Sequence, residues 1–242
     1  MIWLRGIIIT VGLLVFWQVF VWVFQLPTFI LPTPLEVFHA FYANAGILAA
    51  ETWPTLLEML LGLLAGVTLG CSAALAIALF KPLRLWVLPI LVMSQAIPTF
   101  AIAPLLVMWL GYGMASKVAM VAIVVFFPIT TSFYDGLKRT APIWLDLAKT
   151  MGGTPWRVLW RIRVPAALPQ LGSGLRIAAA IAPIGAIIGE WVGSSYGLGF
   201  LMLNANGRLQ IALMFATLVI ITILALILYF GVDMLLKKFI TW

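Results

Sequence analysis

Six long apolar stretches dominate this sequence, and each is long enough to cross the hydrocarbon core of a membrane as a helix. Such a span needs about 20 residues, because a helix rises only about 1.5 Å per residue. Apolar residues make up 64% of the chain and charged residues only 9%, too few to cover a soluble surface. We therefore predict an all-α polytopic membrane protein with about six transmembrane helices. The predicted spans are residues 6–26, 54–80, 85–111, 114–135, 172–194 and 209–236.

The basic residues indicate how these spans are oriented. If the spans alternate across the membrane, all of the 14 Lys and Arg residues except Lys117 and Arg208 fall on one side. Cytoplasmic loops carry an excess of positive charge, so both termini are predicted to be cytoplasmic in a multi-pass protein of the cell (inner or plasma) membrane. Residues 27–53 carry no Lys or Arg and are predicted to be external, with a helix after Leu31-Pro32-Thr33-Pro34. With no linker or repeat evident, residues 1–242 are predicted to form a single transmembrane domain.

This chain lacks the residues that several classes of activity require. Cys71 is the only cysteine and His39 the only histidine, so one chain offers no disulfide framework and no Cys- or His-based metal site. The sequence contains no Gly-x4-Gly-Lys-Ser/Thr loop and no metal-protease helix motif. We therefore predict no catalytic residues, no metal and no cofactor in this chain, and we do not favour a membrane enzyme.

Glycines recur at four-residue spacing in two of the predicted spans. This spacing puts them on one helix face, where the lack of a side chain lets two backbones approach closely. Glycine is also simply frequent in membrane helices, but two triplets in register favour a packing role. The triplets are Gly62, Gly66 and Gly70 in the second span, and Gly185, Gly189 and Gly193 in the fifth.

Prolines interrupt the third, fourth and fifth predicted spans. A proline frees a carbonyl that lipid cannot satisfy, so a broken helix is best tolerated where it faces protein or a wet cavity. Each single proline is also consistent with a packing kink. The prolines lie at positions 89, 98, 104, 128 and 183.

The cytoplasmic segment at residues 141–165 has the pattern of two short helices joined by a turn. Pro142 can open a helix, Gly152-Gly153 can end it, and Thr154-Pro155 can start the next one. Leu145, Leu147 and Ala148 are predicted to supply an apolar patch on the first helix. A basic loop held to anionic headgroups would explain the arginines that follow, but not the turn between two helices.

The same segment resembles the signature Glu-Ala-Ala-x3-Gly-x9-Ile-x-Leu-Pro of permeases in binding-protein-dependent, type I ATP-binding-cassette (ABC) importers. Its spacing is intact, and it departs only by Asp146 for Glu, Leu147 for Ala and Val164 for Leu. In that family the segment forms a cytoplasmic coupling helix that docks in a cleft of the ATPase subunit. The resemblance implies that the following residues couple this chain to such a subunit: Asp146, Leu147, Ala148, Gly152, Gly153, Ile162 and Pro165.

Other segments resemble one branch of these permeases. Leu31-Pro32-Thr33-Pro34, and Glu190 with Gly197-Leu198-Gly199, are similar to the nitrate, sulfonate and taurine branch. Gly189-Glu190-Trp191-Val192-Gly193 and residues 201–206 look most like permeases for thiamine-precursor pyrimidines of the hydroxymethylpyrimidine type. The resemblance implies such a pyrimidine as substrate, with sulfonate, taurine or nitrate as alternatives. Candidate substrate-path residues are Glu190, Tyr196, Asn204 and Asn206, although Glu190 is equally consistent with a structural carboxylate.

The resemblance also implies a set of partners. These are a second permease copy, two cytosolic ATPase subunits that bind ATP and magnesium, and an external or periplasmic solute-binding protein; nucleic acid is not implied. The main alternative is an ion-coupled secondary transporter, which usually needs acidic or polar groups near mid-membrane. Against it, the acidic residues of the spans are predicted near span ends. They are Glu58, Asp135, Glu190 and Asp233.

Overall fold

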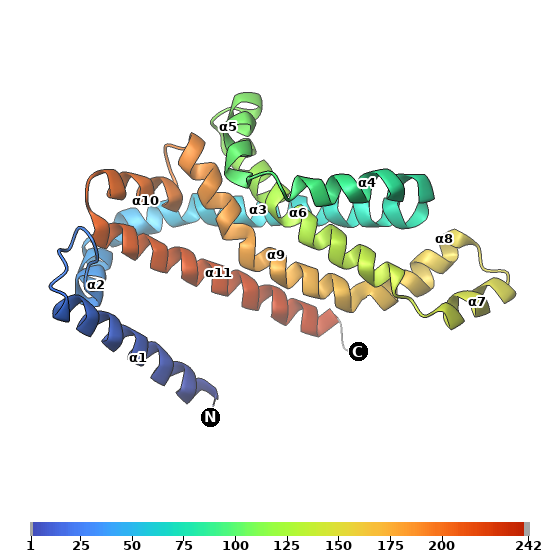
Figure 1. Ribbon diagram of the computed structural model, residues 1–242, viewed down its shortest axis with the longest axis horizontal. Coiled ribbons are helices and arrows are strands. Elements are labelled where there is room, and N and C mark those ends of the chain that lie inside the picture. The colour runs from blue at the N-terminus through green and yellow to red at the C-terminus, as the bar shows by residue number, and fades with distance from the viewer. Residues whose placement is uncertain (1, 240–242) are drawn as a thin grey trace. The chain divides into compact units, whose positions relative to one another are not determined.

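The computed structural model describes residues 2–239, and every regular element within that range is helical, which confirms the all-α prediction (Figure 1). Contacts divide the chain into two compact units, which are described separately below. The first unit is Met1–Thr55 with Ser195–Ile223, and the second is Leu56–Ser194 with Leu224–Trp242. That residues 1–242 act as one domain stays a prediction.

The first unit is built from short and partial helices around a small apolar core. At the start of its second helix, Thr33 Oγ1 accepts the Glu36 N–H and the Glu36 carboxylate accepts the Thr33 N–H, a reciprocal capping box. The core residues are Val37, Leu48, Ala205, Leu213 and Ala216. The helices of this unit are α1 (Ile2–Val23), α2 (Pro34–Ala43), the start of α3 (Ala45–Leu79), α10 (Leu198–Gly207) and the start of α11 (Ile211–Phe239).

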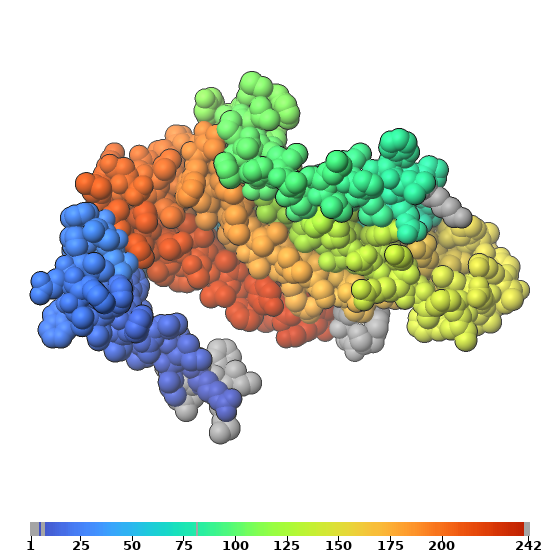
Figure 2. All heavy atoms as spheres, in the orientation of Figure 1, coloured from blue at the N-terminus to red at the C-terminus, as the bar shows by residue number. Residues whose placement is uncertain are grey.

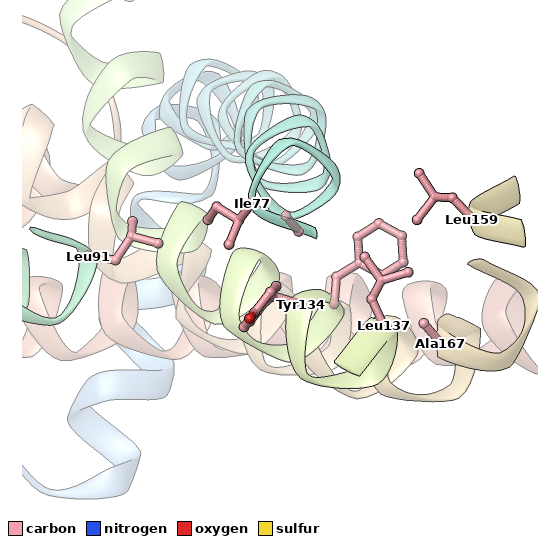
Figure 3. Packing of buried hydrophobic residues seen from close by; sticks show 8 residues of the cluster. Ile77, Leu91, Tyr134, Leu137, Leu159 and Ala167 are labelled. Carbon is pink, nitrogen blue, oxygen red and sulfur yellow. The ribbon is translucent and has the colours of Figure 1, made fainter. Parts of the chain in front are cut away.

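The second unit holds the main apolar core. Figure 3 shows Ile77 and Leu91 packed with Tyr134, Leu137, Leu159 and Ala167. The core therefore joins helices that are far apart in the sequence. The helices of this unit are the rest of α3, α4 (Lys81–Ser94), α5 (Thr99–Leu110), α6 (Met114–Lys138), α7 (Pro142–Thr150), α8 (Pro155–Val158), a π-helical turn (Leu159–Arg163), α9 (Val164–Gly193) and the end of α11. The core residues come from α3, α4, α6, the π-helical turn and α9.

Helix α6 is packed closely against α3 and α9 through glycines. A Cβ at Gly66 would overlap the Val125 side chain, and one at Gly70 would lie 2.9 Å from Ile129 Cγ2. On the other side of α6, a Cβ at Gly185 would lie 2.7 Å from the Val121 Cα. Backbones at this separation leave no room for a methyl group, so glycine is required at each of these contacts. The rest of the two triplets show the same kind of contact: Gly62 against Val121, Gly189 against Lys117 and Gly193 against Val107.

The predicted spans correspond to the helices with one clear exception. Within residues 2–239, four helical segments are long and apolar enough to cross a membrane: Ala45–Leu79, Met114–Lys138, Pro155–Gly193 and Ile211–Phe239. The first predicted span corresponds to the shorter apolar helix α1. The third predicted span is not continuous, because its two halves, Pro82–Ser94 and Thr99–Leu110, meet at an angle of 104°.

The break falls at one of the five prolines and not at the others. Pro98 lies immediately before α5, where the chain bends. Pro89, Pro104, Pro128 and Pro183 lie inside continuous helices and do not break the spans, which agrees with the alternative that a single proline is accommodated by packing. A proline removes one backbone hydrogen bond but leaves a helix free to continue where neighbouring turns and packed helices support it.

Candidate functional site

The segment between α6 and α9 forms the two short helices that the sequence predicts. Pro142 occupies the first turn of α7, where its missing N–H costs no helical hydrogen bond. At the other end, the Gly152 N–H donates to the Lys149 carbonyl (3.0 Å) and the Gly153 N–H donates to the Ala148 carbonyl (2.8 Å). These two bonds form a Schellman motif, which satisfies carbonyls left open at a helix end. The motif requires a left-handed residue, and Gly152 has φ = +72°.

The chain then turns back into the core. Thr154 caps α8 by accepting the Arg157 N–H, and Pro155 occupies the first turn. Leu159, in the π-helical turn, is 1% exposed and packs near Leu137 and Ala167 (Figure 3). Arg163 Nε donates to the carbonyl of Leu137 at 3.1 Å, which satisfies a group at the end of α6. Both contacts fix the end of this segment to the main core.

The exposed face of α7 differs from the predicted apolar patch. Ala148 is buried and Leu145 is half-buried, so these two residues face the protein. Leu147 is exposed as predicted, but its exposed neighbours are Ile143, Trp144 and Met151, which the sequence analysis did not identify. Figure 2 shows the yellow-green atoms of this segment uncovered on the face that it presents. The 3.6-residue helical period, applied from Pro142, would have put Ile143 and Leu147 on one face.

A cavity of about 780 Å³ lies between α7 and the start of α9. Four of the seven predicted coupling residues line it: Leu147, Ala148, Ile162 and Pro165. The remaining three have other positions. Gly152 and Gly153 form the turn, and Asp146 is exposed and makes an ion pair with Lys149 at 3.1 Å. The segment therefore gathers its signature residues around one cavity and its connecting turn.

The predicted substrate-path residues fall into both units. Glu190, near the end of α9, is fully buried in the second unit and lines no open mouth there. Tyr196, Asn204 and Asn206 belong to the first unit. Tyr196 and Asn204 are half-buried and Asn206 is exposed, while Asn204 Nδ2 donates to the Phe200 carbonyl of its own helix at 3.2 Å.

The turn at Gly197-Leu198-Gly199 is held by side chains of α3. The Gly197 N–H donates to the Glu51 carboxylate, and the Leu198 N–H donates to Thr55 Oγ1 at 2.8 Å. Glu51 and Thr55 are one helical turn apart, so together they cap the first N–H groups of α10. Gly197 has φ = +100°, a conformation that favours glycine. The sequence analysis quoted this turn but did not identify its two partners, because nothing local to either segment indicates the pairing.

Two charged residues are buried in the structure, although the sequence analysis predicted both of them near a membrane surface. Lys117 was predicted to face the external side, but its side chain is fully buried and its ammonium donates to the carbonyls of Tyr112 (2.9 Å) and Gly113 (3.2 Å). Glu58 is also fully buried, and it lies well inside α3 because that helix begins at Ala45 rather than at residue 54. Within residues 2–239 no three His, Cys, Asp or Glu side chains gather closely enough to hold a metal ion.

Comparison with known proteins gives one consistent result. Residues 66–241 match the protein family described as "binding-protein-dependent transport system inner membrane component". A probable ABC transporter permease protein of Haemophilus influenzae is 50% identical over 98% of this chain and 97% of its own length. Two further relatives are 33% identical: the formylaminopyrimidine transport permease ThiX of Halalkalibacterium halodurans (95% of this chain, 92% of its own) and the riboflavin transport system permease RibX of Chloroflexus aurantiacus (95% and 87%).

The fold is also similar to that of a solved transporter. A crystal form of the MetNI methionine ABC transporter in inward-facing conformations matches 81% of this chain and 97% of the matched chain, with a TM-score of 0.71 and 19% identity. At that identity the likeness shows a shared fold alone.

Proposed function

The chain belongs to the family of binding-protein-dependent transport system inner membrane components, and from this membership we propose that it couples an ABC importer to its ATPase through α7. The family is one of ABC importer permease subunits, which are multi-pass membrane proteins and not themselves enzymes. Membership also implies an ATPase and a solute-binding protein as partners. That the ATPase and the permease are each present in two copies belongs to the proposal.

The single observation that supports coupling through α7 is the placement of the signature residues. Leu147, Ala148, Ile162 and Pro165 line one cavity, beside a turn that fixes the direction in which α7 leaves the core. The outer face of α7 carries Ile143, Leu147 and Met151, which are 73%, 59% and 78% exposed. Exposed apolar residues at one-turn spacing are typical of a helix that fits into an apolar groove.

Copurification of the ATPase subunit tests this docking directly. The Leu147→Asp variant should lose the ATPase, because a carboxylate would be buried without a partner in the interface. The control is Leu209→Asp, since Leu209 is 69% exposed, has φ = +58° and lies between α10 and α11. Aspartate tolerates that backbone conformation, so the control should keep the ATPase. Equal retention by the two variants would exclude α7 as the docking helix.

In the proposed cycle, this chain forms the translocation pathway and transmits the motion of the ATPase to the membrane helices. The partner subunit hydrolyses ATP. Closure of two ATPases around ATP draws the paired α7 helices together. The turn at Gly152-Gly153 and the anchor at Leu159 pass this motion to α6 and α9. The membrane helices then change from inward-facing to outward-facing, and substrate enters from the binding protein on the external side.

For the substrate, we propose a thiamine-precursor pyrimidine. The relative ThiX is named for formylaminopyrimidine and RibX for riboflavin, and both of these compounds contain a pyrimidine ring. Glu190, Tyr196, Asn204 and Asn206 remain the proposed substrate-path residues, with carboxylate and amide groups that suit the amino group and ring nitrogens of such a compound. Sulfonate, taurine or nitrate is the second candidate, on the resemblance of residues 31–37 and 197–199.

Competition for uptake distinguishes these substrates. The complex of permease, ATPase and binding protein is reconstituted in liposomes, and uptake of a labelled aminopyrimidine is measured with unlabelled pyrimidine, taurine or nitrate in excess. Pyrimidine alone should compete. Uptake of labelled taurine or nitrate, with no uptake of pyrimidine, would assign the chain to the other substrates and leave its role as a permease intact.

A further inference from the structure

Three charged side chains from three helices meet in the interior of the second unit. Glu58 of α3, Lys117 of α6 and Glu190 of α9 are each 0% exposed. Charged residues are almost never fully buried unless they are paired. In a membrane protein they are also rare within spans, and each has a specific reason to be there.

Glycine contacts bring the three residues to one level of their helices. Gly62, one turn after Glu58, packs on Val121, which lies one turn after Lys117. The Glu58 carboxyl group therefore lies beside the Lys117 and Glu190 side chains, and both act on it electrostatically. Neither oxygen of Glu58 receives a hydrogen bond from an N–H group or a hydroxyl. The Lys117 ammonium is fixed in place by the carbonyls of Tyr112 and Gly113. Gly189 lets α9 approach, since a Cβ there would lie 3.1 Å from the Lys117 Cα.

The charges of the three groups do not balance if all of them are ionised. Two carboxylates and one ammonium leave one net negative charge, away from water. An unmatched buried charge costs several kcal/mol, which helix packing does not recover. Two ionised carboxylates also repel each other and have no hydrogen with which to form a hydrogen bond. One proton on the pair cancels the net negative charge. It also supplies a hydrogen-bond donor, because a protonated carboxyl group donates to the neighbouring carboxylate.

We propose that Glu58 and Glu190 bind one proton between them, so that the cluster Glu58–Lys117–Glu190 is electrically neutral and a carboxyl–carboxylate hydrogen bond joins α3 to α9. Among the side chains that the structure describes, the fully buried charged groups are these three, one from each of α3, α6 and α9.

The position of the cluster indicates what it does in the fold. Lys117 lies near the start of α6, about 30 Å along that helix from Lys138, where the chain leaves for α7. The proton therefore holds α3, α6 and α9 together at the end of the helices opposite the proposed ATPase contact. This role is independent of docking through α7.

Stability of glutamine variants tests the charge balance. In Glu58→Gln or Glu190→Gln, the carboxamide donates to the remaining carboxylate, which still matches Lys117, so the thermal midpoint of the purified complex should stay within about 2 °C of the parent. In the double variant Lys117 has no counter-charge, and the midpoint should fall by about 10 °C. A double variant as stable as either single variant would overturn the proposal. A single variant as unstable as the double variant would overturn it too.

Infrared spectroscopy tests the proton itself and does not depend on the stability of the variants. The parent complex should show the carbonyl stretch of a buried protonated carboxylic acid at neutral pH. The same band should be missing in both Glu58→Gln and Glu190→Gln, because each variant leaves a single carboxylate paired with Lys117. The absence of the band in the parent, or its persistence in both variants, would contradict the shared proton.

Discussion

Gly152 and Gly153 adjoin each other but are glycines for different reasons. Gly152 has φ = +72° and open space around its Cα, so a side chain there meets backbone strain rather than a neighbour. Gly153 has an ordinary backbone, but a Cβ would lie 2.7 Å from the Ala148 carbonyl oxygen. The first residue sets the direction of the turn and the second allows the chain to pass close to the end of α7. A β-branched residue at position 152, or a side chain at position 153, therefore alters the direction in which α7 leaves the core.

The capping of α10 by Thr55 gives a prediction for a single hydroxyl group. Thr55→Val leaves the buried Leu198 N–H without its partner, which should lower stability by about 1–3 kcal/mol. The matched control is Thr217→Val, since Thr217 is equally buried but its hydroxyl donates to Leu213, a carbonyl of its own helix. Thermal unfolding of the purified protein should show the larger loss for Thr55→Val. Equal losses for the two variants would show that the Leu198 contact contributes little.

The positions of buried charges could not be predicted from the sequence. Hydropathy placed Lys117 at the external end of the span 114–135 and Glu58 near the start of the span 54–80, because each lies close to the boundary of an apolar stretch. Their burial depends on partners from other helices and on the carbonyls of Tyr112 and Gly113. Such pairings depend on tertiary structure. Lys117 was one of only two exceptions to the charge asymmetry, and its burial explains the exception.

Helix α6 makes close glycine contacts with two neighbouring helices. It is packed against α3 through Gly62, Gly66 and Gly70, and against α9 through Gly185 and Gly189. Without a hydrophobic driving force inside a bilayer, helices associate by close packing, which small residues make possible. The four-residue spacing of both triplets was visible in the sequence. That five of the six glycines meet α6, while Gly193 meets Val107 of α5, was not.

This packing predicts a strong effect of volume at Gly66. Gly66→Leu would drive a side chain into Val125 and the backbone of Ala122, an overpacking that costs about 1–3 kcal/mol or more. Gly46→Leu lies on the same helix in open space and serves as the control. Size-exclusion chromatography in detergent should show aggregation or loss of the Gly66→Leu variant and a normal profile for the control. A normal profile for both would mean that α3 can move away from α6 without penalty.

The helices themselves were predicted unevenly. The helix–turn–helix at residues 142–158 followed from Pro142, Gly152 and Thr154-Pro155, because each of these residues acts locally. An interruption of the third span was predicted, but its place was not, because Pro89, Pro98 and Pro104 look alike in the sequence. Whether a proline kinks or breaks a helix depends on which neighbours satisfy the freed carbonyl.

For the whole molecule, the membrane orientation remains to be tested, and the single cysteine makes the test simple. In a Cys71→Ser background, a membrane-impermeant maleimide should label a His39→Cys variant in intact cells, since His39 is exposed in the predicted external segment. An Asp146→Cys variant, on the exposed side of α7, should be labelled only after the membrane is permeabilised. The opposite pattern would reverse the orientation that the basic residues predict.

ATP-dependent uptake by a Gly152→Val variant tests the central claim most directly. Valine is β-branched and does not tolerate φ = +72°, whereas asparagine does, so Gly152→Asn is the matched control. In liposomes that contain the permease, its ATPase and the binding protein, Gly152→Asn should transport like the parent. Gly152→Val should insert normally and transport nothing. Full uptake by Gly152→Val would contradict the account, because force from the ATPase would then reach the membrane helices without the turn at the end of α7.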